Sequence, residues 1–257
     1  MIKILVAGFP GSMAKKTVEM VNDSDSFQLV GIFNPALKTT NPSDYDLANN
    51  VAIFNNFDKI NVNADVWIDF TVPTAVFNNA KFAINHGIHP VIGTSGMSDE
   101  QQNELVKLAK QTGVGGILAP NFGISAVLLM KFAKEAAKYM PHAEIIEMHH
   151  ADKLDAPSGT ALSTAKMIAQ ARGSVDESKS EESVPGVRGG DYKGVRIHSV
   201  RLPGYIAHEQ VLFGSTGEAL TIRQDSFDRQ SFMGGVKLAV PAAAKAKELI
   251  VGLENIL

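Results

Sequence analysis

The sequence contains no cysteine, and this absence excludes several kinds of functional site. Disulfide bonds, cysteine-ligated zinc, iron–sulfur clusters and thiol nucleophiles all require that residue. Aldehyde dehydrogenases that form a thioester on cysteine are excluded for the same reason. No charge sign dominates either, since 24 Lys and Arg against 27 Asp and Glu give a net charge of −3. Nonspecific binders of nucleic acid or of acidic membranes are usually far more basic, so we expect neither partner.

Long apolar segments are also missing. The longest uncharged stretch lies between Lys110 and Lys131, and Gly115, Pro120 and Gly123 divide it into a short strand, a turn and a helix. The first residues, MIKILVAG, enter an apolar strand with no basic segment or cleavage site, so we expect no signal peptide and a cytoplasmic location. With 257 residues, 45% of them apolar, the chain is long enough for one large domain or two smaller ones.

Residues 1–122 alternate short apolar runs with amphipathic segments. Strands are expected at IKILVA, FQLVGIF, ADVWIDFT, HPVIG and GGILAP, and helices at 12–23, 73–87 and 98–113. The last helix has Ser98 and Gln101 at the spacing of a capping box and stops at Gly113. Alternation of this kind predicts a parallel sheet covered by helices on both faces. The predicted fold class of this part is α/β, with a Rossmann-like doubly wound sheet.

After residue 122 the pattern becomes that of a second, α+β domain. Helices are expected at 124–140 and 160–173, with a strand at 143–150 between them. Three consecutive strand-like runs, VRIHSVRL, HEQVLFGS and EALTIRQDSF, then favour a mixed or antiparallel sheet. The polar, glycine-rich segment 174–194 is predicted to be a mobile connection or a lid. The C-terminal residues are expected to be helical and to return to the first domain.

A glycine-rich turn follows the first predicted strand and opens the first predicted helix, which is the context of a dinucleotide-binding fingerprint. Gly8 permits the tight turn, and Gly11 lets the backbone approach a pyrophosphate bound by the N–H groups and dipole of the helix. Ala14 is small enough for close packing of helix on strand. The spacing G-x-x-G-x-x-A, with Pro10 in the middle, departs from G-x-G-x-x-G. The alternative interpretation is a glycine-rich turn that binds no ligand.

The second predicted strand ends at Asn34, where an acidic residue that binds the cofactor ribose is expected. A neutral Asn34 neither anchors the 2′-hydroxyl as a carboxylate does nor repels a 2′-phosphate. Lys38 is close enough in sequence to pair with such a phosphate, or it is an ordinary solvated lysine. The choice between NADH and NADPH therefore stays open.

Two loops after later strands of the same sheet, at 93–96 and 119–122, are expected to line the nicotinamide half of a cofactor. Ligands of open α/β sheets bind beyond the carboxyl ends of the strands, which is where both loops fall. Asp69 also ends a predicted strand, and a structural hydrogen-bonding role is at least as consistent with its position.

Two adjacent histidines, His149 and His150, are followed three residues later by Lys153. Histidine exchanges a proton near neutral pH, and lysine supplies a positive charge or a proton. No H-x-x-x-H spacing and no cysteine accompanies the pair, so we expect no metal site. The alternative is that these histidines are structural.

A helix start follows the same cluster. Ser158 suits an N-cap, so the N–H groups of Gly159 and Thr160 would face outward and bind a carboxylate or phosphate. Proton donors and an anion cradle within a dozen or so residues indicate an anionic small molecule that is protonated. Further candidates for an anionic site, each also consistent with an ordinary surface or interface residue, are His198, Arg201, His208, Arg223 and Arg229.

These motifs resemble those of the dihydrodipicolinate reductase family. The resemblance rests on VAGFPGSMA, DFT, GTSG, APNF and, most specifically, EMHHADKLDAPSGTA, and it covers essentially the whole chain. It implies an NADH- or NADPH-dependent oxidoreductase of lysine and diaminopimelate biosynthesis, acting on the dicarboxylate cyclic imine formed from 4-hydroxy-tetrahydrodipicolinate. It also implies a cofactor domain at 1–122 completed by 237–257, a substrate-binding and oligomerisation domain at 123–236, and a homotetramer.

The resemblance further implies roles for single residues. His149 would be the proton donor or acceptor and Lys153 a proton donor, while His150, Gly159 and Thr160 would hold a substrate carboxylate. Asn34 departs from the acidic residue that some family members use on the ribose. The other residues implied in cofactor binding are Gly8, Phe9, Pro10, Gly11, Ser12, Met13, Gly93, Thr94, Ser95, Ala119, Pro120, Asn121 and Phe122.

Two alternatives remain at this stage. One is a reductase of the same architecture that acts on a different anionic carbonyl or imine. The other is a redox-sensing regulator that binds NAD(H) without turnover, although we find no basic cluster or helix-turn-helix that would serve it.

Overall fold

The structure is a computed structural model that describes residues 1–175 and 180–257. The chain divides into two compact units, Met1–Phe122 with Phe232–Leu257, and Gly123–Ser231. The resemblance implies a return of the chain to the first unit at residue 237. In the structure the first unit resumes at Phe232, directly before the helix α6 (Met233–Ala243).

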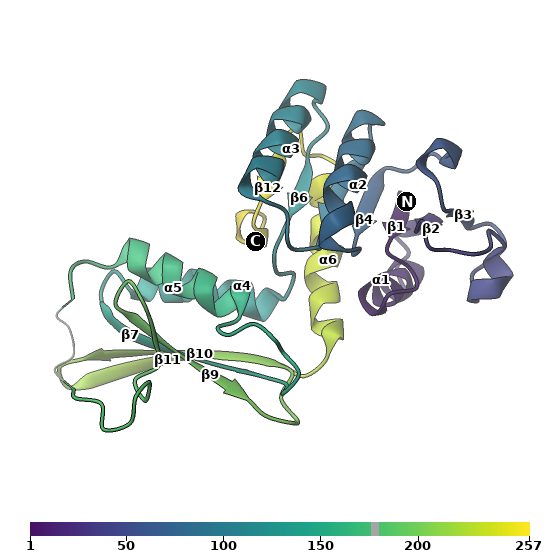
Figure 1. Ribbon diagram of the computed structural model, residues 1–257. Coiled ribbons are helices and arrows are strands. Elements are labelled where there is room, and N and C mark those ends of the chain that lie inside the picture. The colour runs from purple at the N-terminus through teal and green to yellow at the C-terminus, as the bar shows by residue number, and fades with distance from the viewer. Residues whose placement is uncertain (176–179) are drawn as a thin grey trace. The chain divides into compact units, whose positions relative to one another are not determined.

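Seven parallel strands form the sheet of the first unit, in the order β12-β6-β5-β4-β1-β2-β3 (Figure 1). Ile4, Val6, Trp67 and Ile68 in the central strands are fully buried, as expected when helices cover both faces. The predicted Rossmann-like α/β class is confirmed. The strands are β1 (Ile2–Ala7), β2 (Phe27–Phe33), β3 (Ala52–Phe54), β4 (Val66–Asp69), β5 (His89–Ile92), β6 (Gly116–Leu118) and β12 (Leu249–Val251).

Helices of the first unit pack in two pairs on this sheet. α1 (Ser12–Asn22) contacts α6, and α2 (Pro73–Asn85) contacts α3 (Asp99–Thr112). The predicted capping box of α3 is present, since Ser98 Oγ accepts from the Gln101 N–H and Gln101 Oε1 accepts from the Ser98 N–H. Gly113 ends this helix with a φ of +72°. Within the described residues, no helix is long and apolar enough to cross a membrane.

The second unit is built on a five-stranded mixed sheet, in the order β11-β10-β7-β9-β8. β7 (His142–His149) runs parallel to β9 (Val195–Arg201), and the other neighbours are antiparallel. α4 (Ile124–Ala136) and α5 (Gly159–Ala171) lie together along one face, so the predicted α+β domain is confirmed (Figure 1). The remaining strands are β8 (Gly190–Tyr192), β10 (Ala207–Ser215) and β11 (Glu218–Ser226).

Three strands escaped prediction, and each has only three residues. β8 lies inside the segment 174–194, whose prediction as a mobile connection is wrong at 190–192, where β8 pairs with β9. Residues 176–179 of that segment lie outside the described residues. The C-terminal residues were predicted to be helical, which is confirmed for α6 and wrong at β12, a strand that pairs in parallel with β6. The third missed strand, β3, pairs in parallel with β2. β6 is equally short but lies in the apolar run GGILAP, which made it visible in the sequence. β3, β8 and β12 have too little periodicity to be predicted, because pairing with a neighbouring strand defines them.

Short 3₁₀ turns complete the chain. They lie at Pro42–Tyr45, Phe57–Lys59, Arg229–Phe232 and Leu253–Asn255.

One close backbone contact joins the returning helix to the end of the first segment. A Cβ at Gly235 of α6 would overlap the carbonyl oxygen of Phe122. We therefore expect G235A to lower the free energy of unfolding by about 1–3 kcal/mol, the usual cost of overpacking. The exposed Gly234 in the same helix is the control, because Ala there should raise stability by up to about 1 kcal/mol. Urea unfolding followed by circular dichroism measures both, and equal effects of the two substitutions would contradict the close contact.

Candidate functional site

Close backbone contacts build the glycine-rich turn after β1. Gly8 has a φ of +101°, and a Cβ there would overlap the carbonyl oxygen of Phe70, so the position requires glycine. The Gly8 N–H donates to the Phe33 carbonyl (3.0 Å) and the Gly11 N–H to the Gly8 carbonyl (2.9 Å). Gly11 is the N-cap of α1, and no side chain in the described part of the chain caps this helix. The uncapped N-terminus fits the pyrophosphate of a dinucleotide.

Asn34 at the end of β2 supports this turn. Its Nδ2 donates to the Phe9 carbonyl (2.8 Å), and its Oδ1 accepts from the Ala36 N–H (3.0 Å). The position where a ribose-binding carboxylate was sought therefore holds an amide whose donor is already used on the turn. Lys38, the other residue considered for this end of the cofactor, is exposed.

The loop at 93–96 is held by Asp69, whose side chain is completely buried. Asp69 Oδ1 accepts from Thr94 Oγ1 (2.8 Å) and from Thr71 Oγ1 (2.6 Å). Its Oδ2 accepts from Asn79 Nδ2 (2.8 Å) and from Trp67 Nε1 (3.1 Å). Asp69 thus has the structural role that its sequence position allowed. The Thr94 hydroxyl also accepts from the Thr71 N–H (2.7 Å), so this hydroxyl is used to fix the loop.

The predicted cofactor residues gather at one edge of the parallel sheet. They follow β1, β5 and β6, whose carboxyl ends meet there because all three strands are parallel members of one sheet. Phe9, Ala119 and Phe122 are buried and shape the loops, whereas Pro10 and Ser95 are exposed. The remaining members are exposed or half-buried, namely Gly8, Gly11, Ser12, Met13, Gly93, Thr94, Pro120 and Asn121.

In the second unit, His149 ends β7 and is held by a carboxylate two residues earlier. Glu147 Oε2 lies 2.5 Å from His149 Nδ1, and the Glu147 side chain is fully buried while that of His149 is 14% exposed. Arg201, at the end of β9, donates from Nη1 to Oε2 (2.9 Å) and from Nη2 to Oε1 (2.7 Å). The Ser158 N–H also donates to Oε1 (3.2 Å).

These contacts decide the charge of Glu147. Burial alone raises its pKa, but hydrogen bonds from His149, Arg201 and Ser199 and the charge of Arg201 outweigh burial and lower the pKa to about 2. Glu147 is therefore an ionised carboxylate at neutral pH, and it holds β7, β9 and the start of α5 together.

The start of α5 is accessible at Gly159. Ser158 Oγ accepts from the Ala161 N–H (3.1 Å), which confirms the predicted N-cap. Gly159 is exposed, and a Cβ there would meet no atom within 4 Å, so a ligand can reach the backbone. Thr160, the next residue, is half-buried. The arrangement can bind a carboxylate or a phosphate.

His150 and Lys153 lie on the turn between β7 and α5. The Lys153 N–H donates to the His150 carbonyl (3.2 Å), and both side chains are partly exposed. Lys153 Nζ lies 2.7 Å from Asp155 Oδ1, and this hydrogen bond lowers the pKa of Asp155 below its ordinary value. The predicted proton donors and the helix start thus lie on the segment that runs from the end of β7 to the start of α5.

Sequence reasoning missed a polar row that crosses the sheet beneath α4 and α5. The strand register places Ser199, Glu147, Glu209 and Gln224 side by side on β9, β7, β10 and β11. Glu209 is only 2% exposed, and its Oε1 has no partner among the described residues. Its position was visible in principle, because Glu209 lies two residues before the apolar Val211 on one strand, so both side chains face inward.

Burial raises the pKa of Glu209 to about 7, with a further increase from the charge of Glu147 and an opposing hydrogen bond from Thr164. Two carboxyl groups thus lie side by side, and Glu209 is the one that binds a proton more readily.

Of the other basic candidates, only Arg201 joins this site. His198 Nε2 pairs with Glu144 (2.9 Å), and Arg223 Nη2 and His208 Nδ1 both pair with Asp225 (2.9 and 2.7 Å). Arg229 lies in a 3₁₀ turn before α6.

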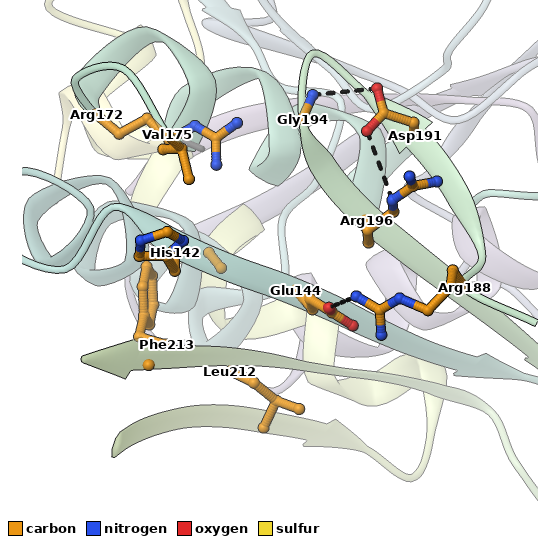
Figure 2. A pocket seen from close by; sticks show the side chains of 12 residues that line it. His142, Glu144, Arg172, Val175, Arg188, Asp191, Gly194, Arg196, Leu212 and Phe213 are labelled. Carbon is orange, nitrogen blue, oxygen red and sulfur yellow. Dashed lines mark hydrogen bonds and ion pairs between the residues drawn. The ribbon is translucent and has the colours of Figure 1, made fainter. Parts of the chain in front are cut away.

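A cavity of about 470 Å³ lies at the opposite end of β7, around His142 and Glu144 (Figure 2). Figure 2 shows Glu144 paired with Arg188, and Asp191 with Arg196. Seven residue steps along a strand separate His142 from His149, a distance of about 23 Å. The cavity is therefore separate from the predicted site. Among residues 1–175 and 180–257, no group of three or more His, Asp or Glu side chains is arranged to hold a metal ion.

Both units of the chain match models of one protein family. Residues 2–122 match the description "Dihydrodipicolinate reductase, N-terminus" and residues 125–257 match "Dihydrodipicolinate reductase, C-terminus". The chain is 61% identical over 257 residues to the 4-hydroxy-tetrahydrodipicolinate reductase of Lactobacillus acidophilus, covering 99% of this chain and 98% of the relative. The chain belongs to the dihydrodipicolinate reductase family.

Further matches agree with this assignment. The 4-hydroxy-tetrahydrodipicolinate reductase of Enterococcus faecalis is 50% identical over 262 residues, covering both chains completely. A dipicolinate-bound dihydrodipicolinate reductase from Paenisporosarcina sp. TG-14 has a TM-score of 0.91 at 43% identity over 100% of each chain. A probable dehydrogenase from Thermotoga maritima, at 13% identity and a TM-score of 0.65 over 99% of this chain and 92% of that one, shares the fold alone.

The resemblance inferred from the motifs is thus confirmed. The chain is an oxidoreductase, and its family together with its Rossmann-like fold implies a nicotinamide cofactor. The relatives reported above are reductases, which argues against a regulator without turnover.

The buried Glu209 gives a prediction about stability and pH. Its pKa is raised from 4.5 to about 7 in the folded state, so its stabilising contribution is complete below pH 4.5 and is lost as the pH rises through 7. E209Q removes this dependence. We expect E209Q to gain up to about 3 kcal/mol relative to wild type between pH 4.5 and pH 8, since each pKa unit corresponds to about 1.4 kcal/mol. Urea unfolding at both pH values measures the free energy of unfolding of E209Q relative to wild type. If this difference is the same at both pH values, the raised pKa of Glu209 is contradicted.

Proposed function

We propose that this chain uses NADH or NADPH to reduce the dicarboxylate cyclic imine formed from 4-hydroxy-tetrahydrodipicolinate, in lysine and diaminopimelate biosynthesis. The observation that carries the proposal is the segment 147–161, where a carboxylate-bound histidine, a lysine and an open helix N-terminus lie together. A dicarboxylate that must be protonated needs cationic groups, anion-binding N–H groups and a proton donor, and this segment supplies all three.

The start of α5 binds one substrate carboxylate in this proposal. The N–H groups of Gly159 and Thr160 lie at the positive end of the helix dipole, and His150 lies on the turn before it. The exposed Gly159 leaves room for the carboxylate to approach the backbone.

His149 and Lys153 handle the proton. Glu147 is hydrogen-bonded to Nδ1 of His149, so Nε2 is the ring nitrogen left for the substrate. Lys153, tied to Asp155 at 2.7 Å, places a second proton donor on the neighbouring turn. Each group contributes a factor of about 10²–10⁴ if it transfers a proton in the rate-limiting step.

The first unit binds the cofactor, whose nicotinamide supplies the hydride when it is bound. The turn at residues 8–13 receives the pyrophosphate, with Gly8 and Gly11 keeping the backbone accessible. The loops at 93–95 and 119–122 line the nicotinamide half, and Asp69 fixes the first of them through Thr94.

The proposal includes a homotetramer assembled through the second unit. α4 and α5 cover the face of the sheet that carries Ile145, Ile197 and Val211, all of which are buried. Because side chains alternate along a strand, Ile146 and Leu212 point to the other face, where they are only half-buried. A second copy of the chain covering these residues would bury that face.

A coupled assay tests the reaction. The unstable substrate is generated from pyruvate and aspartate semialdehyde by its synthase, and oxidation of NADH and of NADPH is followed separately. We expect substrate-dependent oxidation by the wild type and a loss of about 10²–10⁴-fold in H149Q. H142Q, at the exposed far end of the same strand, is the matched control and should keep wild-type turnover. Folded wild-type protein that binds the cofactor but oxidises neither form would overturn the proposal.

Asn34 gives a prediction about cofactor choice. In N34D a carboxylate can accept from the ribose 2′-hydroxyl and repels a 2′-phosphate, so the ratio of kcat/KM for NADH over NADPH should rise at least about tenfold. N34A is the control, because it also loses the bond to the Phe9 carbonyl but adds no charge. It should weaken the use of both cofactors alike. If the ratio of kcat/KM for NADH over NADPH is unchanged in N34D, the end of β2 does not contact the ribose.

A further inference from the structure

We infer that Glu147 is a positioning residue for His149, fixing the tautomer in which Nδ1 carries the hydrogen and Nε2 exchanges the proton. The effect on catalysis that we infer rests on the proposed function. The geometry of the contact does not depend on it. Glu147 is two residues before His149 on β7, so both side chains project from the same face of the sheet.

The contact itself selects the tautomer. Glu147 Oε2 lies 2.5 Å from His149 Nδ1, well within hydrogen-bond distance. An ionised carboxylate only accepts hydrogen bonds, so the hydrogen between the two atoms belongs to Nδ1. In the neutral ring Nε2 then carries a lone pair, and in the protonated ring it carries the hydrogen that can be transferred.

The surroundings keep Glu147 an acceptor. The Arg201 guanidinium donates one hydrogen bond to each of its oxygens, and the Ser158 N–H donates a further one to Oε1. Ser199 on β9 also donates, and the pKa of Glu147 is lowered to about 2. Arg201 is fixed in turn, since its Nη2 donates to the Asp155 carbonyl as well (2.7 Å).

The neighbouring strand strengthens the assignment. Glu209 on β10 lies directly opposite Glu147 in the register, and Thr164 of α5 hydrogen-bonds to Glu209. Two adjacent carboxylates repel each other when both are ionised, so a single negative charge is favoured below the pKa of Glu209, about 7. Arg201 and His149 are hydrogen-bonded to Glu147 and stabilise its negative charge. Glu147 therefore stays ionised, and Glu209 binds the proton more readily.

The test replaces each carboxyl group by an amide of the same shape. In E147Q the amide can either accept from Nδ1 or donate to it, so the tautomer is no longer fixed. We expect kcat of E147Q at pH 7 to fall by about 10²–10⁴-fold, with a change in KM of less than about fivefold, because the histidine is misaligned for proton transfer rather than for binding. E209Q is the matched control on the neighbouring strand and should keep wild-type kcat at that pH.

The tautomer is read directly by ¹⁵N chemical shifts of labelled histidine, with the His149 signal assigned by its loss in H149Q. We expect the Nδ1–H form in wild type and in E209Q, and a gain of the Nε2–H form in E147Q. This measurement needs neither substrate nor cofactor. Absence of turnover in wild type would therefore overturn the proposed function and leave the tautomer to be judged separately.

Three results would overturn the inference. One is an Nε2–H form of His149 in wild type at neutral pH. The second is an E147Q that keeps wild-type kcat. The third is an equal loss of kcat in E147Q and E209Q without a change of tautomer, which would indicate a purely structural role. Should E147Q not fold, E147D decides the question, because its retained charge predicts the Nδ1–H form and activity above that of H149Q.

Discussion

The buried carboxylate of Glu147 is the constraint on which the second unit depends. A charge removed from water must be paired and hydrogen-bonded, or its burial costs several kcal/mol. Arg201 and the N–H of Ser158 meet this requirement, the first from 54 residues along the chain and the second from 11. The end of β9 and the start of α5 are thereby held beside the end of β7. The histidine, the lysine turn and the helix N-terminus all follow from that junction.

The first unit uses the same device. Asp69, at the end of β4, is also completely buried, and its oxygens collect donors from the strand, the following loop, α2 and the loop after β5. Each unit thus places one buried carboxylate near the carboxyl end of a central strand, where it holds neighbouring segments together. The start of α5, fixed this way, combines a rigid scaffold with an accessible backbone at Gly159, which is what binding an anion requires.

Asn34 is a side chain at the end of β2 whose hydrogen bonds are used within the protein. Its amide donor holds the carbonyl of Phe9 and so stabilises the glycine-rich turn. A carboxylate in that place would have no hydrogen to donate to this carbonyl. The chain therefore gains a fixed turn and carries no negative charge at this position.

The sequence by itself determined the elements that have periodicity or a specific motif. The long strands, the capped helices such as α3, the glycine-rich turn and the His149–Lys153 cluster were all readable, because their signals are local. Tertiary structure alone decided the strands β3, β8 and β12, the pairing of Arg201 with Glu147, and the place of Glu209 directly opposite Glu147. These features depend on strand register and burial, which bring together residues that local pattern cannot relate. The same register decided that Asn34 supports the turn and that His198 and His208 lie elsewhere.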